Sequence, residues 1–150
     1  MSVKIFFIFS ARRAYSRVSS TKLISPSVER RSISAYAYCV EAVHPEVIIA
    51  ANISKNTTSI NEDAAKDYET AFGLLYDFVD MFVVNVSCPN VVGLTSLQDI
   101  SFLSDIVDRL LDLRMLYDTY KPILLKVSPD LAHQQLDDII DYCLRSGIDG

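Results

Sequence analysis

Met81-Phe-Val-Val-Asn-Val86 is a short apolar run in which only Asn85 is polar. Its length and its valine content are typical of a strand that is covered on both faces. Before it, apolar residues recur at helical spacing from Asn61, a candidate helix cap, to about Asp80. After it, residues 102–111 form the apolar stripe of a second helix. The sequence therefore predicts a buried strand between two helices.

The same alternation continues on both sides of this strand. Val47-Ile-Ile-Ala-Ala51 is predicted to be an earlier strand, and Pro122-Ile-Leu-Leu-Lys-Val127 a later one that begins with proline. A last helix is expected from about His133, with Gly147 as its left-handed stop. Ile148 would then open a fourth strand. The order of elements is strand and helix in turn.

Strands covered on both faces and separated by single helices predict an α/β fold with parallel strands. Their spacing fits a partial (β/α)8 TIM barrel, of which residues 41–150 would supply about three units. A doubly wound sheet is the alternative. It is disfavoured because the four glycines do not form the G-x-G-x-x-G spacing of a nucleotide loop. A full barrel needs about 250 residues, so we expect an incomplete barrel domain.

Residues 1–40 differ in composition from the rest of the chain. They hold seven of the 14 Lys and Arg residues and one of the 19 Asp and Glu residues. A basic, Ser-rich segment of this kind is typical of a mitochondrial transit peptide. We favour unrelated sequence joined to a truncated gene, because the segment stands where barrel strands are expected. Ser25 is a candidate cap for a helix over residues 26–43. Residues 1–40 thus stay unassigned.

Charge, cysteine spacing and hydropathy exclude several classes of protein. The net charge of −5 argues against a nucleic-acid partner, which would need clustered Lys and Arg. Cys39, Cys88 and Cys143 lack the paired spacing of a disulfide framework or a zinc site, so no metal is expected. The apolar run from Ile5 to Phe9 is far shorter than the about 20 residues of a membrane span. A protein of a reducing compartment is expected.

Polar residues follow or end each of the three predicted strands, at Asn52, Asn85 and Lys126. The site of a parallel barrel lies at these carboxyl ends. An amide buried without partners costs about 1–3 kcal/mol, and an ammonium in an apolar strand calls for an anion or a polarised cofactor. Taken singly, each residue has an ordinary explanation, such as a turn cap for Asn85, solvent exposure for Lys126 or burial as a small hydrophobe for Cys88. Together they predict a ligand site.

Several motifs occur in one order along the chain. They are Ala51-Asn-Ile-Ser-Lys-Asn56, then Asn85-Val-Ser-Cys-Pro-Asn90 with Gly93-Leu-Thr-Ser-Leu-Gln98, then Leu125-Lys-Val-Ser-Pro-Asp-Leu131. Over about residues 47–150 the sequence resembles the dihydroorotate dehydrogenase family. The resemblance implies a (β/α)8 barrel that binds FMN at its mouth and oxidises dihydroorotate to orotate in pyrimidine (UMP) biosynthesis. It also implies a role for each matching residue: Cys88 as the base that takes a proton from the substrate while a hydride passes to the flavin, Asn85 and Asn90 as substrate ligands, and Asn52, Asn85 and Lys126 as FMN ligands.

The class within the family stays open. The membrane-associated, quinone-using enzymes that residues 93–98 resemble usually have serine as the base, whereas those linked to fumarate or NAD usually have cysteine, as at Cys88. The electron acceptor is accordingly quinone, fumarate or NAD. The location is cytoplasmic, peripheral on the inner membrane, or mitochondrial. Ser54 also departs from the usual glycine, and its Cβ would strain a left-handed backbone.

Two other functions remain as alternatives. The chain is either an inactive, truncated remnant of the enzyme or a barrel like that of dihydropyrimidine dehydrogenase, which also uses a cysteine. A remnant with exposed strand edges would associate, so a homo-oligomer is expected.

Overall fold

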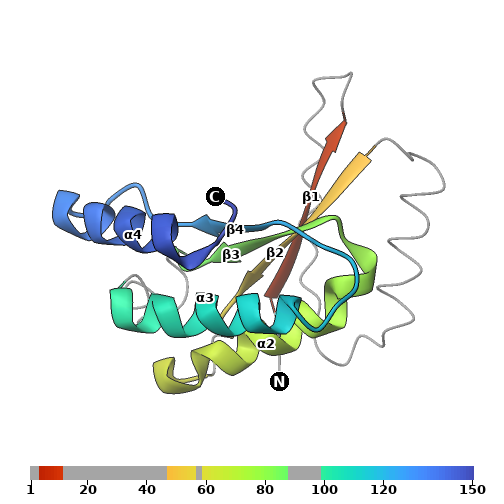
Figure 1. Cartoon of the computed structure of the whole chain (residues 1–150), viewed down its shortest axis with the longest axis horizontal. Helices are drawn as coiled ribbons and strands as arrows, with labels where there is room; N and C mark the ends of the chain where they lie inside the picture. The colour runs from red at the N-terminus through yellow and green to blue at the C-terminus, as the bar shows by residue number, and fades with distance from the viewer. Residues whose placement is uncertain (1–3, 12–46, 57–58, 88–98) are drawn as a thin grey trace.

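The computed structural model describes residues 4–11, 47–56, 59–87 and 99–150, and for residues 4–11 and Val47 it describes the backbone alone. Strands, α-helices (α) and 3₁₀ helices (η) follow one another along these residues (Figure 1). Their bounds are β1 Lys4–Ala11, β2 Val47–Ser54, η1 Asn61–Asp63, α2 Ala64–Leu75, η2 Tyr76–Phe78, β3 Met81–Asn85, α3 Ile100–Arg114, β4 Ile123–Lys126 and α4 His133–Ser146.

The strands form one sheet in the order β1-β2-β3-β4. β2, β3 and β4 are parallel, which confirms the predicted alternation of parallel strands and helices. Their register pairs Asn52 with Val83 and Asn85 with Lys126. β1 was not predicted as a strand, and it pairs with β2 in the antiparallel direction. The basic N-terminal segment therefore contributes a strand to the sheet.

The helices α2 and α3 lie side by side on one face of the sheet (Figure 1). Ile49, Ala51 and Ile53 of β2 belong to the buried core beneath them. Because successive side chains of a strand point to opposite faces, Asn52 and Ser54 lie on the other face. The same alternation places Val84 in the core and Asn85 opposite. The predicted polar residues thus share the face that α2 and α3 leave uncovered.

The ends of the helices differ from the prediction in places. Asn61 was predicted to cap the helix that follows, but it begins a 3₁₀ turn, and α2 begins at Ala64. Asp99 caps α3, since its side chain accepts a hydrogen bond from the Ser101 N–H. Gly147 ends α4 with φ of 82°, as predicted. The helix expected over residues 26–43 lies outside the described residues.

The residues after α4 lie beside β4. The Asp149 N–H donates to the carbonyl of Ile123 at 3.1 Å, and the Leu125 N–H donates to the carbonyl of Gly150 at 2.7 Å. The strand predicted from Ile148 is not formed as a regular strand. Its backbone nevertheless makes the hydrogen bonds that place it next to β4.

Candidate functional site

The carboxyl ends of β2, β3 and β4 carry a row of polar side chains. Asn85 and Lys126 are register partners on neighbouring strands. Ile53 pairs with Val84, so one further step of the same register brings Ser54 level with Asn85. Asn52 lies two residues before Ser54 on the same face. We call Asn52, Ser54, Asn85 and Lys126 the polar row.

Asn85 is buried, with 6% of its surface exposed. Its Oδ1 accepts hydrogen bonds from the Ser87 N–H at 3.1 Å and from the Ser87 hydroxyl at 2.9 Å. Its main-chain carbonyl accepts a hydrogen bond from the Tyr68 hydroxyl at 2.9 Å. The side chain therefore caps a turn, the ordinary explanation weighed from the sequence. The Nδ2 amide group is the part of Asn85 that remains for a ligand.

Lys126 is exposed, and its ammonium donates a hydrogen bond to the Ser87 hydroxyl at 2.6 Å. The sequence predicted that the apolar strand would bury this charge, and this was wrong: Lys126 is exposed, although Ser54 and Asn85 on the same face of the sheet are buried. A positive charge is still present at the carboxyl edge. Ser87 links it to the amide of Asn85, an arrangement that the sequence motif alone did not reveal.

Asn52 and Ser54 contain polar atoms without partners. Asn52 Oδ1 and Ser54 Oγ are both buried, and neither has a hydrogen bond in the structure. A buried acceptor or donor left in this state costs about 1–3 kcal/mol. The backbone strain that a left-handed conformation would cause at Ser54 is absent, since among the described residues only a glycine has a positive φ. A serine in place of glycine is thus compatible with this strand.

The loop after β2 is held by its own side chains. The Lys55 ammonium is buried and donates to the carbonyls of Asn56, at 3.2 Å, and Ser59. The Asn56 N–H donates to Asp67 Oδ2 on α2 at 2.8 Å. Lys55 thus faces its own loop and not the polar row. The sequence did not predict these roles of Tyr68 and Asp67. The signal that could have indicated them is a polar group on the buried face of a helix, where it needs a hydrogen-bond partner.

Cys88 and Asn90, the predicted base and substrate ligand, lie outside the described residues. In the sequence, Cys88 is the residue after Ser87, and Asn90 comes two residues later. No helix within the described ranges is long and apolar enough to cross a membrane.

The family model described as dihydroorotate dehydrogenase matches residues 19–150. The chain belongs to the dihydroorotate dehydrogenase family. Its α/β structure, with three parallel strands alternating with helices, matches part of the TIM barrel of that family. The match begins inside the basic segment, at residue 19.

Curated relatives carry the name dihydroorotate dehydrogenase (quinone). The protein of Christiangramia forsetii is 44% identical over 104 residues, which are 69% of this chain and 31% of the relative. That of Nostoc sp. is 46% identical over 92 residues, which are 61% of this chain and 24% of the relative. The chain thus spans about a third or less of the length of the curated relatives it matches.

Solved structures support the fold. The dihydroorotate dehydrogenase of Eimeria tenella in complex with ferulenol superposes with a TM-score of 0.72 and 22% identity, over 89% of this chain and 40% of that one. The ligand-free form gives a TM-score of 0.70 at 20% identity. In a barrel of this family, the uncovered face of β2, β3 and β4 corresponds to the interior.

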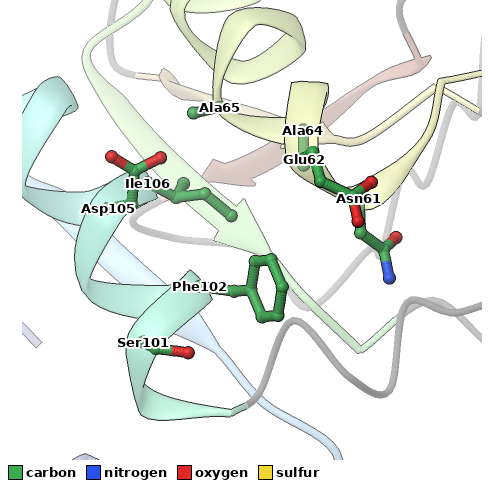
Figure 2. Close-up of a pocket in the computed structure, with 8 residues that line it drawn as sticks. All are labelled: Asn61, Glu62, Ala64, Ala65, Ser101, Phe102, Asp105 and Ile106. Carbon is green, nitrogen blue, oxygen red and sulfur yellow. The ribbon is translucent and has the colours of Figure 1, made fainter.

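A separate groove of about 250 Å³ lies between the start of α2 and the start of α3 (Figure 2). It is on the helical side of the sheet, away from the polar row. Its two carboxylates come from Glu62 and Asp105, and the second is paired with Arg109 at 2.8 Å. The groove is lined by Asn61, Glu62, Ala64, Ala65, Ser101, Phe102, Asp105 and Ile106.

Proposed function

We propose that this chain is part of an FMN-dependent dihydroorotate dehydrogenase that oxidises dihydroorotate to orotate in UMP biosynthesis. The observation that carries the proposal is the polar row at the carboxyl edge of β2, β3 and β4, on the face that corresponds to a barrel interior. Buried oxygens without partners at Asn52 and Ser54 favour a polar ligand there. Membership of the family favours FMN as that ligand.

The residues of the row suit a flavin. Asn52 has a free acceptor, Asn85 has a free amide donor, and Lys126 supplies a positive charge. When bound, FMN supplies the acceptor for the hydride that leaves the substrate. We propose that Asn52, Asn85 and Lys126 hold it. The Lys126 ammonium would favour negative charge at this edge through an interaction that is already in place before the reaction.

We further propose that Cys88 takes the proton and that Asn85 and Asn90 bind the substrate. A thiol with an ordinary pKa of about 8.5 works as a base only after it has become a thiolate, so the site must favour that form. Asn85 Oδ1 accepts two hydrogen bonds from Ser87, and these fix the orientation of the side-chain amide. The direction of its N–H groups is thereby fixed as well. Such a fixed donor can orient a substrate carbonyl or carboxylate.

The names of the relatives favour quinone over fumarate or NAD as the electron acceptor. Since such quinones reside in lipid, we propose that the whole protein acts at the surface of the inner membrane. The barrel domain would be residues 41–150, and residues 1–40 would be an additional segment whose β1 pairs with the edge of that domain's sheet. Cys88 departs from the serine usual in the quinone class, so the electron acceptor is tested by comparing quinone with fumarate and NAD.

The test is FMN content and binding of the purified chain. We expect a flavin absorbance band and quenching of FMN fluorescence on titration, with weaker binding for Asn52→Ala and Lys126→Met. Lys66→Met is the matched control, because Lys66 is an exposed lysine on α2, on the other side of the sheet, and forms an ion pair with Asp63. A chain that never retains FMN would contradict the proposal.

Activity is tested separately, by reduction of a quinone, fumarate or NAD with dihydroorotate as the donor. Quinone reduction that is lost in Cys88→Ala and partly kept in Cys88→Ser is the expected result, because serine is the base in related enzymes. Activity with uracil in place of dihydroorotate would instead select the dihydropyrimidine dehydrogenase-like alternative. Absence of turnover with retained FMN would favour the inactive remnant.

A further inference from the structure

Ser54 is the last residue of β2, and none of its surface is exposed. Its Oγ is buried and has no hydrogen-bond partner in the structure. Serine hydroxyls in proteins usually bond to the backbone or to water, so an isolated one is unusual. This hydroxyl is therefore a polar group of the strand that the protein itself leaves unsatisfied.

The position of Ser54 links this hydroxyl to the polar row. Asn52, two residues earlier on the same face, also has a buried oxygen without a partner. The pairing of Ile53 with Val84 sets Ser54 level with Asn85 at the carboxyl edge. Two unsatisfied oxygens on one face of one strand thus adjoin the amide of Asn85. One ligand can satisfy both oxygens.

The backbone of Ser54 gives no other reason for the residue. The dihydroorotate dehydrogenase motif that this segment resembles has glycine at this position, but the strand here does not need a positive φ. The hydroxyl also holds no loop or helix in place, unlike Tyr68, whose hydroxyl bonds to the carbonyl of Asn85. The hydroxyl is therefore the part of Ser54 that no other group of the protein uses.

We propose that Ser54 is an additional ligand contact specific to this chain, whose hydroxyl donates a hydrogen bond to a carbonyl or ring-nitrogen acceptor of the bound flavin. The inference rests on the proposed function, because it requires a flavin at the polar row. Asn52 cannot satisfy Ser54 by itself, since the two oxygens do not form a hydrogen bond with each other. The flavin heterocycle has carbonyl and ring-nitrogen acceptors for the Ser54 hydroxyl and a ring N–H donor for Asn52 Oδ1, so one ligand can satisfy both atoms.

The test compares Ser54→Ala and Ser54→Gly with the unaltered chain. FMN affinity is measured by fluorescence quenching, and the melting temperature is measured without FMN. We expect Ser54→Ala to bind FMN about 3- to 10-fold more weakly, the effect of one neutral hydrogen bond. We also expect its FMN-free melting temperature to rise by about 2–4 °C, because an unsatisfied hydroxyl has been removed. Ser104→Ala on α3 is the control and should leave FMN affinity unchanged.

The opposite signs of the two effects distinguish a ligand contact from a structural hydroxyl. The proposal for Ser54 is overturned if Ser54→Ala lowers the melting temperature of the FMN-free chain. It is also overturned if the unaltered chain binds FMN and Ser54→Ala binds it equally well, and in both cases the proposed function still stands. If the unaltered chain binds no FMN, the proposed function fails and Ser54 loses its ligand with it. Ser54→Gly should behave as the alanine variant does in FMN affinity.

Discussion

Ser87 connects two residues of the polar row that come from different strands. Its hydroxyl donates to Asn85 Oδ1 at 2.9 Å and accepts from the Lys126 ammonium at 2.6 Å. The chain of hydrogen bonds restricts the orientation of the amide and of the ammonium at once. A flexible lysine held in this way loses less freedom when a ligand binds, and binding is correspondingly tighter.

We predict that Ser87→Ala weakens FMN binding about 3- to 10-fold while changing stability by less than about 1 kcal/mol. The first effect follows from the released ammonium, and the second from the partial exposure of the bond. Ser101→Ala is a matched control, since Ser101 makes the same two hydrogen bonds to Asp99, at 3.1 and 2.9 Å, on the outer helix α3. Fluorescence titration and urea unfolding measure the two effects, and equal FMN affinities of both variants would contradict the prediction.

Tyr68 fixes the carboxyl end of β3 from α2. It is fully buried, and its hydroxyl donates to the carbonyl of Asn85. We predict that Tyr68→Phe destabilises the chain by about 1–3 kcal/mol, because a buried carbonyl loses that partner while the ring packing is kept. Tyr117→Phe is the comparison, as the Tyr117 ring stacks on Tyr76 at a centroid distance of 3.6 Å and is only partly buried. The free energy of unfolding of both variants is measured with urea. A value for Tyr68→Phe equal to or higher than that for Tyr117→Phe would argue against this role.

At the scale of single elements, the end of α4 depends on one backbone conformation. Gly147 has φ of 82°, and a Cβ added there would meet no atom within 4 Å. A residue with a Cβ is therefore unfavourable here because of the backbone torsion, and not because of a steric contact. We predict that Gly147→Ala destabilises the chain by about 1 kcal/mol.

Gly73 provides the control of opposite sign. It lies within α2, where a Cβ would be 3.6 Å from the Tyr117 hydroxyl, an ordinary contact. Gly73→Ala should stabilise the chain by about 0.5–1 kcal/mol because alanine is the better helix former. In thermal melts, we expect Gly147→Ala to have a lower melting temperature than the unaltered chain and Gly73→Ala to have a higher one. Two shifts of the same sign would refute the assignment of the strain to Gly147.

Asp149 anchors the residues that follow α4. Its carboxylate accepts hydrogen bonds from Arg114 at 2.6 Å, from the Ile123 N–H at 2.8 Å and from the Tyr120 hydroxyl. Burial acts to raise the pKa of Asp149, but these hydrogen bonds and the charge of Arg114 outweigh it and lower the pKa. A carboxyl whose folded pKa is depressed stabilises the fold above its unfolded pKa, about 3.9, and loses that effect as the pH falls through the folded value.

We accordingly predict that Asp149→Asn is less stable than the unaltered chain at neutral pH. The difference should narrow as the pH falls below about 4. Urea unfolding at a series of pH values measures it. Asp118→Asn is the control, and it should show no such convergence, since Asp118 is an exposed aspartate of the loop before β4. A constant difference for Asp149→Asn down to pH 2 would show that its carboxylate is not the titrating group.

The elements that the sequence predicted well are those with a complete local signal. Apolar runs marked β2, β3 and β4, because a strand buried on one face and facing a barrel interior on the other has no polar alternation. Asn61 was misjudged as a cap, since a 3₁₀ turn before α2 uses the same polar residues. Lys126 was judged buried from its apolar neighbours in sequence, although burial depends on which face of the sheet is covered. The partner of Asn85, Ser87, was evident only in three dimensions.

At the scale of the whole molecule, α4 carries an apolar stripe that its neighbours leave open. Ile139 is buried, but Leu136, Ile140 and Leu144 are 37%, 46% and 80% exposed at a spacing of four residues. Contiguous exposed apolar surface of this kind favours association. We predict that the chain self-associates in a concentration-dependent way, and that Leu144→Lys shifts it toward monomer in sedimentation velocity experiments.

Met115→Lys is the control for this prediction. Met115 is 81% exposed but lies at the end of α3, away from the stripe on α4. The same change of charge there should leave the association unchanged. A monomer at all concentrations in the unaltered chain would contradict the prediction, as would equal responses of the two variants.

The antiparallel pairing of β1 with β2 has a topological consequence. In a closed parallel barrel, each strand has two neighbours that run in its own direction. β2 has one such neighbour, β3, while its other edge is occupied over eight register pairs by β1. Any parallel strand that was to close the ring at that edge would first have to displace β1. Extending the parallel sheet at this edge would therefore require strand exchange at β2.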